Sequence, residues 1–137
     1  MPRILVVDDS ESVLAYLESI LRKISHEVFA ASSGTQALQI LERESVDLAI
    51  IDIYMPAPDG LEVMRRSREM KLDVPFIAIS AQPSPSNKFG PARAFGAQIA
   101  LQKPFSRERL IEAVEAILDV HLGSSIPQRP RKRSARP

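Results

Sequence analysis

Acidic, hydroxyl and lysine side chains follow short apolar runs in this chain. Two adjacent acids, Asp8 and Asp9, follow the first run, and Asp52 follows the third. Ser80 and Lys103 follow the fourth and fifth. Carboxylates that share a site repel one another unless a cation lies among them, and oxygen ligands favour Mg²⁺, Mn²⁺ or Ca²⁺. With a lysine and a hydroxyl beside them, these residue types are typical of phosphoryl transfer, in which a carboxylate can itself accept the phosphoryl group.

The elements that position these residues alternate along the chain. Five short, mainly apolar runs predict strands at 4–7, 27–31, 48–51, 75–79 and, more weakly, 99–102. Apolar residues at helical spacing predict helices at 12–25, 33–44 and 61–71, and a last helix that Ser106 caps. Alternating strands and helices predict an α/β fold in three layers, a doubly wound five-stranded parallel sheet. We expect the flavodoxin-like order 2-1-3-4-5, in which ligands bind at the carboxyl ends of the strands.

Composition limits the classes of protein. The 137 residues, 45% of them hydrophobic, suit one domain. No cysteine is present, so disulfide frameworks and thiol catalysis are excluded. The only two histidines, His26 and His121, show no partner pattern, and we expect them to be structural or exposed. No apolar run has the length of a signal-peptide core or a membrane span, so we expect a soluble, cytoplasmic protein that does not bind membranes.

The net charge of +1 hides an asymmetry. The last fifteen residues, 123–137, hold five of the 18 Lys and Arg residues and no acid, which leaves 13 cations against 17 acids, a net charge of −4, in 1–122. We expect 1–122 to form the domain and 123–137 to be a basic, proline-rich, disordered tail. A solvated extension is the simpler interpretation of this tail. Contact with an acidic partner or nucleic acid is the weaker alternative, because the tail lacks interleaved aromatic residues.

The strand-end residues occur within motifs that resemble those of the response-regulator receiver family. The resemblance covers residues 3 to about 120, and the motifs occur in the family's order. They are Val7-Asp8-Asp9, Asp52-Ile53-Tyr54-Met55-Pro56 with Asp59-Gly60, Ile79-Ser80-Ala81, and Gly96-Ala97 before Lys103-Pro104-Phe105. Each motif alone is weak evidence, whereas the ordered set is specific. The resemblance implies the same flavodoxin-like fold and a role in two-component phosphorelay signalling.

The resemblance also implies a role for each acid. Asp52 would accept a phosphoryl group from a histidine kinase or a histidine phosphotransfer protein. Asp9, Asp52 and the backbone carbonyl of Tyr54 would hold Mg²⁺, or alternatively Mn²⁺, directly, and Asp8 would act mainly through water. The chain would catalyse only its own phosphorylation and dephosphorylation, so it is not expected to be an enzyme acting on other substrates.

The other two site residues would bind the phosphoryl group. The resemblance implies that Lys103 and the hydroxyl of Ser80 bind its oxygens, and that Ser80 moves toward them as the switch. It also predicts a cis peptide bond between Lys103 and Pro104, which would aim the lysine into the site. The signal would pass by protein–protein contact to an output protein that the sequence does not identify, from a monomer or weak dimer.

Three features depart from the family pattern. Ala100 stands three residues before the lysine, where the family commonly has a bulky residue that swings inward. Three prolines and a glycine in 82–91 predict that the fourth helix is short or displaced. No effector domain follows the last helix, so we expect a stand-alone receiver.

Two other functions therefore stay open. The first is a receiver-like interaction module that acts without phosphorylation, which the altered switch region motivates. The second is a phosphohydrolase with an aspartate nucleophile, although Asp8-Asp9-Ser10 lacks the Asp-x-Asp pattern typical of those enzymes at the first strand.

Overall fold

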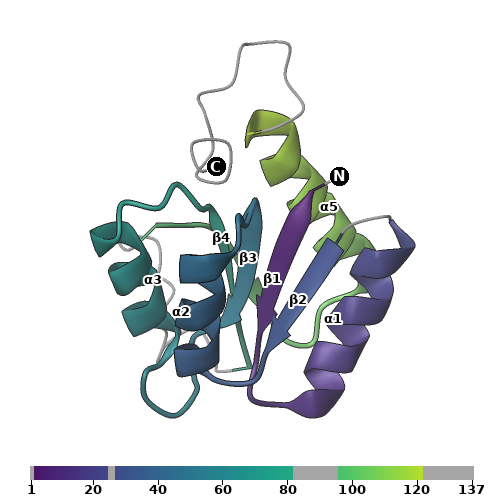
Figure 1. Cartoon of the computed structure of the whole chain (residues 1–137). Helices are drawn as coiled ribbons and strands as arrows, with labels where there is room; N and C mark the ends of the chain where they lie inside the picture. Colours follow the sequence, from purple (N-terminus) through teal and green to yellow (C-terminus); the bar gives the residue numbers. More distant parts are fainter. Residues whose placement is uncertain (1, 25–26, 82–95, 122–137) are drawn as a thin grey trace.

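Strands and helices alternate along the chain as the apolar runs predict. The computed structural model describes residues 2–24, 27–81 and 96–121 (Figure 1). Along these residues the elements are β1 (Arg3–Val7), α1 (Glu11–Lys23), β2 (Glu27–Ala31), α2 (Gly34–Arg43), β3 (Leu48–Asp52), α3 (Gly60–Glu69), β4 (Phe76–Ser80), β5 (Ala97–Gln102) and α5 (Arg107–His121). The expected fourth helix and the basic tail fall in 82–95 and 122–137, outside the described residues.

All strand pairs are parallel, and the order is β2-β1-β3-β4-β5, which confirms the predicted flavodoxin-like sheet. At its carboxyl end, β1 pairs Val7 with Ala31 of β2 and with Ile51 of β3. Asp8 follows Val7 and Asp52 follows Ile51, so the register brings the two acids to the same edge of the sheet.

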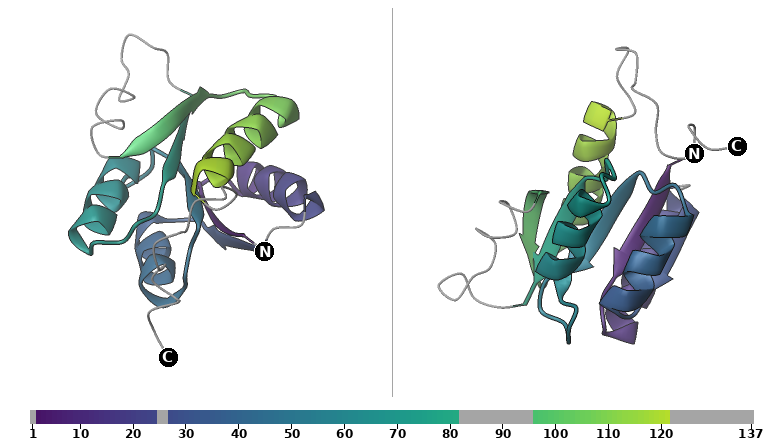
Figure 2. Two further views of the ribbon diagram at one scale, coloured as in Figure 1. Left: turned by 90° about the horizontal axis from the view of Figure 1, so that it is seen from above. Right: turned by 60° about the vertical axis from the view of Figure 1, so that its left-hand side comes forward.

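The helices cover both faces of the sheet, as Figure 2 shows. Side chains alternate between the faces, so Ile4 and Val6 pack with α1 and α5, whereas Leu5 and Val7 pack with α2 and α3. Each layer has its own buried cluster, and the central strands β1, β3 and β4 are apolar apart from one terminal residue each, because both of their faces are covered. Within the described residues, no helix is long and apolar enough to cross a membrane.

Side-chain oxygens define where the helices begin, because each accepts a hydrogen bond from a backbone N–H in the first turn. The four capping pairs are Ser10 with Val13 N (3.3 Å), Ser33 with Gln36 N (3.1 Å), Asp59 with Glu62 N (3.0 Å) and Ser106 with Arg109 N (3.0 Å). The predicted cap at Ser106 is thus confirmed. The side chain of Gln36 differs from a reciprocal capping box, because it accepts from the N–H of Ser32.

Candidate functional site

Three carboxylates meet where β1 and β3 end. One oxygen from each of Asp8, Asp9 and Asp52 lies within 4.8 Å of the others. Asp8 and Asp52 are buried, whereas Asp9 is exposed. The structure thus brings together the three acids that the sequence analysis singled out, and it places one of them at the rim, open to solvent.

Lys103 reaches this cluster from the loop after β5. Its Nζ donates to Asp8 Oδ2 at 2.8 Å and to Asp52 Oδ2 at 3.3 Å. The backbone N–H of Lys103 also donates to the carbonyl of Ser80 at 2.7 Å, which ties the loop to the end of β4. The Lys103-Pro104 bond is cis, as predicted, and so is Ala57-Pro58, for which the sequence analysis made no prediction. Through its two side-chain hydrogen bonds, the ammonium group of Lys103 bridges the two buried acids, Asp8 and Asp52.

The remaining oxygens of the buried acids accept backbone hydrogen bonds. Asp52 Oδ1 accepts from Tyr54 N and Asp8 Oδ1 from Ser10 N, both at 2.9 Å. These bonds fix the rotamers of both carboxylates, so the oxygens that face Lys103 are preorganised.

Burial governs the electrostatics of Asp52. It raises the pKa of this carboxyl, and the negative charge of Asp8 adds to the effect, while the Tyr54 N–H and Lys103 oppose it. For Lys103, burial acts to lower the pKa. The hydrogen bond to Asp8 and the charge of Asp52 outweigh burial, so the net pKa of Lys103 is raised. The lysine is therefore held in its charged form beside Asp52.

Ser80 and Tyr54 both lie near the carboxyl end of β3, one on the neighbouring strand and the other in the following loop. Ser80 ends β4, the strand beside β3, and is buried. Tyr54 lies two residues beyond β3 and is half-buried. The expected roles of the Ser80 hydroxyl and the Tyr54 carbonyl remain predictions, although both residues stand next to Asp52.

The donor set fits a hard divalent cation. Three ionised carboxylates carry three negative charges, and Lys103 supplies one positive charge. About two further positive charges would therefore neutralise the cluster. All the side-chain donors are oxygens, and one acid is open to solvent, which gives a cation an entry path. Mg²⁺, Mn²⁺ and Ca²⁺ prefer such ligands.

Two glycines allow the loop between β3 and α3 to lie close to its neighbours, and the sequence analysis assigned them no role. A Cβ on Gly60 would lie 2.5 Å from the carbonyl oxygen of Asp52 and 2.7 Å from Ile53 Cα. A Cβ on Gly34 would lie 2.2 Å from the carbonyl oxygen of Pro58. The Asp-Gly pair after a proline-rich turn was the available signal for Gly60. Nothing in the sequence linked Gly34 to this loop.

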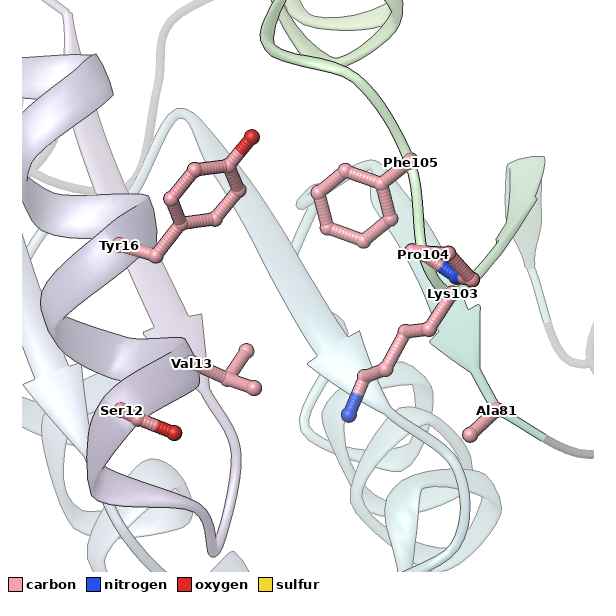
Figure 3. Close-up of a pocket in the computed structure, with 7 residues that line it drawn as sticks. All are labelled: Ser12, Val13, Tyr16, Ala81, Lys103, Pro104 and Phe105. Atoms are coloured by element: carbon pink, nitrogen blue, oxygen red, sulfur yellow. The ribbon is translucent and has the colours of Figure 1, made fainter.

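A mainly apolar cavity of about 530 Å³ adjoins the site. Figure 3 shows the side chains of α1 on one side of it and the loop after β5 on the other. Tyr16 and Phe105 face each other across it with ring centroids 6.3 Å apart, and Lys103 forms part of the wall. Phe105 belonged to a predicted motif, whereas Tyr16 gave no signal beyond its place on a helix.

Ala100 lies within β5 opposite Ala78 of β4. It is half-buried, and the two small side chains stand side by side where the family commonly has a bulky residue at the β5 position. Ala100, which departs from the family pattern, thus lies beside β4, the strand that ends in Ser80.

A doubly wound parallel sheet with acids at β1 and β3 and a lysine after β5 defines the CheY-like class of flavodoxin folds. Comparison with known proteins agrees. A family model for the response regulator receiver domain matches residues 4–115, and the chain therefore belongs to this family, whose members act in two-component systems.

Curated relatives include regulators of transcription. The chain is 36% identical over 116 residues to the alkaline phosphatase synthesis transcriptional regulatory protein PhoP of Bacillus subtilis. It is 40% identical over 117 residues to the transcriptional regulatory protein PrrA of Mycobacterium tuberculosis. These matches cover 85% of this chain but 48% and 50% of the relatives, so the chain spans about half their length.

Solved structures match over nearly their whole length. A CheY-like receiver domain protein from Methanospirillum hungatei has a TM-score of 0.81 at 28% identity, covering 88% of this chain and 95% of that one. Chemotaxis protein CheY4 of Vibrio cholerae has a TM-score of 0.79 at 30% identity, covering 86% and 99%.

Proposed function

We propose that Asp52 accepts a phosphoryl group from a histidine kinase or a histidine phosphotransfer protein, and that the modified domain signals by protein–protein contact. The observation that carries this proposal is the bridge from Lys103 Nζ to Asp8 and Asp52 within a cluster of three carboxylates. Such a bridge places one cation beside the acceptor oxygens and leaves room for a second.

The proposed transfer is an in-line displacement. An oxygen of Asp52 attacks phosphorus while the phosphorus–nitrogen bond of the donor phosphohistidine breaks. The electron pair of that bond stays on the ring nitrogen, which takes up one proton and leaves as neutral imidazole. Hydrolysis reverses the modification, because water attacks the same phosphorus and regenerates the carboxylate with release of phosphate.

The side chains of this domain serve the reaction by position and charge. Lys103 stands 3.3 Å from Asp52 and would neutralise charge on the phosphoryl oxygens. Ser80 would donate its hydroxyl hydrogen to one of those oxygens and shift toward the modified acid. Asp9, Asp52 and the Tyr54 carbonyl would hold Mg²⁺ or Mn²⁺, with Asp8 acting mainly through water. That metal supplies charge neutralisation for the phosphoryl group.

We assign this function to a domain formed by 1–122, with 123–137 as a separate tail. Its phosphodonor and its output partner would be proteins, and a monomer or weak dimer would suffice for both contacts. PhoP and PrrA, which are about twice as long, are named as transcriptional regulators. A link from this domain to transcription is therefore one candidate output.

Intact-mass measurement tests the proposal. The full chain is incubated with Mg²⁺ and a small acyl phosphate, and we expect a gain of one phosphoryl group that a chelator abolishes. Asp52→Asn should show no gain, whereas the matched control Asp59→Asn should keep it, because Asn caps a helix as well as Asp does. Labelling that persists in Asp52→Asn would overturn the assignment of the acceptor.

Ala100 favours one alternative, an interaction module that works without phosphorylation. A folded chain that binds its partner equally well before and after phosphoryl transfer, or that binds Mg²⁺ and never gains mass, would support that alternative over the switch.

A further inference from the structure

The outer face of α5 carries a continuous acidic stripe. Its members recur at spacings of four, three and four residues, all are exposed, and none forms an ion pair with another described residue: Glu108, Glu112, Glu115 and Asp119. At about 100° per residue they fall within a sector of about 60°. The buried residues of α5 lie on the opposite side, so the stripe points straight into solvent.

A second observation concerns the apolar side chains beside the stripe. Val120 is 71% exposed, more than any other large hydrophobic residue in the described ranges, and Ala116 one turn earlier is exposed as well. In addition, Asp119 lies in the last turn of α5, where the helix dipole favours cations. The face therefore matches an occupant that combines several positive charges with an apolar side chain.

The chain itself continues from this face with such a segment. Residues 123–137 contain five cations, no acid and one large apolar residue, Ile126. They open with Gly123-Ser124-Ser125, residue types that favour reversal of the chain. Cations and an apolar residue thus follow α5 directly, in a segment that begins with a turn signal.

The lengths also agree. The stripe from Glu108 to Asp119 rises about 16 Å at 1.5 Å per residue. The eight residues from His121 to Arg129 can span up to about 26 Å, and the seven from Arg129 to Arg136 about 23 Å, at roughly 3.3 Å per residue. The cations can therefore lie along the whole stripe after one reversal.

We propose that residues 123–137 dock along the outer face of α5 of the same molecule, with their cations opposite the acidic stripe and Ile126 against Val120. A short tether keeps the segment at an effective concentration in the millimolar range, so individually weak pairs suffice. A partner that uses this face of α5 must then displace the segment, and a polyanion competes with α5 for the same cations.

Paramagnetic relaxation in the full chain tests this docking. The protein has no cysteine, so Ser134→Cys carries a single spin label. At about 0.05 M salt we expect the amide signals of the outer face of α5 to lose at least half their intensity. At about 1 M salt, where the Debye length falls to about 3 Å, we expect them to recover.

Two variants of the labelled chain separate docking on α5 from general attraction to an acidic domain. The variant that neutralises three of the four acids of the stripe should lose most of the broadening: Glu112→Gln, Glu115→Gln and Asp119→Asn. The matched control changes the same residue types on the α2 and α3 side and should keep it: Glu42→Gln, Glu69→Gln and Asp73→Asn.

Three results would overturn the proposal. Broadening of equal strength in the stripe variant would show that the acids of α5 do not hold the segment. Broadening spread evenly over the domain would show no preferred face. In a third experiment, isotope-labelled chains without a spin label are mixed with spin-labelled chains without the isotope. Broadening in this mixture as strong as that within one chain would assign the contact to a second copy.

Discussion

We expect the close packing of Gly60 to position the backbone that carries the acceptor residue, Asp52. Gly60 is the first residue of α3, and a Cβ there would lie 2.5 Å from the carbonyl oxygen of Asp52 and 2.7 Å from Ile53 Cα. Both of these atoms belong to the backbone, so no flexible side chain can move aside. Gly60→Ala must therefore shift either the start of α3 or the backbone that carries Asp52.

The magnitude follows from this contact. The 2.5 Å distance falls about 0.9 Å short of the 3.4 Å at which ordinary contact begins. Overpacking typically costs about 1–3 kcal/mol, and replacing glycine in a helix returns up to about 1 kcal/mol, so we expect a net loss of about 1–2 kcal/mol. The domain stays folded at that loss. A shift approaching 1 Å at the acceptor should slow phosphorylation about 10- to 100-fold.

The assay pairs urea unfolding with the rate of mass gain under a small acyl phosphate and Mg²⁺. Gly34→Ala is the matched control, because its Cβ would lie 2.2 Å from the carbonyl oxygen of Pro58, in the same loop but six residues from Asp52. We expect a similar loss of stability there and less than a threefold change in rate. Equal rates in both variants would refute the positioning role of Gly60.

Three further predictions concern single side chains. Ser67 Oγ is buried without a hydrogen-bond partner in the described part of the chain, so Ser67→Ala should raise the free energy of unfolding by about 1 kcal/mol in urea titrations, and more than the exposed control Ser19→Ala. Arg65 and Arg66 lower the pKa of Glu62 to about 2, so its stabilising contribution, present above pH about 4.5, should fade toward pH 2. The difference in melting temperature between the parent and Glu62→Gln should narrow accordingly, and a constant difference would contradict this. Lys103→Ala leaves Asp8 and Asp52 without their shared cation, so Mg²⁺ should raise its melting temperature more than that of the parent.

The order of the strands and the meeting of the acids could be predicted, because both follow from periodicity along the chain. Apolar runs separated by helical spacing leave few topologies, and the carboxyl ends of parallel strands must share an edge. The sequence pattern alone therefore places Asp8 and Asp52 near each other. Their hydrogen bonds to backbone N–H groups were not predicted, since they depend on the path of individual loops.

Other features depend on contacts across the fold that no local pattern records. The spacing of the acids predicted no difference in burial between them, yet Asp8 is fully buried and makes the shorter bond to Lys103. Burial of Asp8 results from packing around the end of β1, which spacing along the chain does not reveal. The approach of Gly34 to Pro58 is likewise set by the packing of α2 against the loop before α3.

The bridge between Lys103 and Asp8 joins residues 95 positions apart, and the strand that delivers the lysine, β5, lies at the edge of the sheet. Edge elements open more readily than central ones, so β5 can detach locally from β4 while β1, β3 and β4 keep their hydrogen bonds to one another. Such an opening would remove the cation from both acids without global unfolding. Hydrogen exchange in β5 would then report how often the site is complete, and ligands that hold Lys103 in place would slow that exchange.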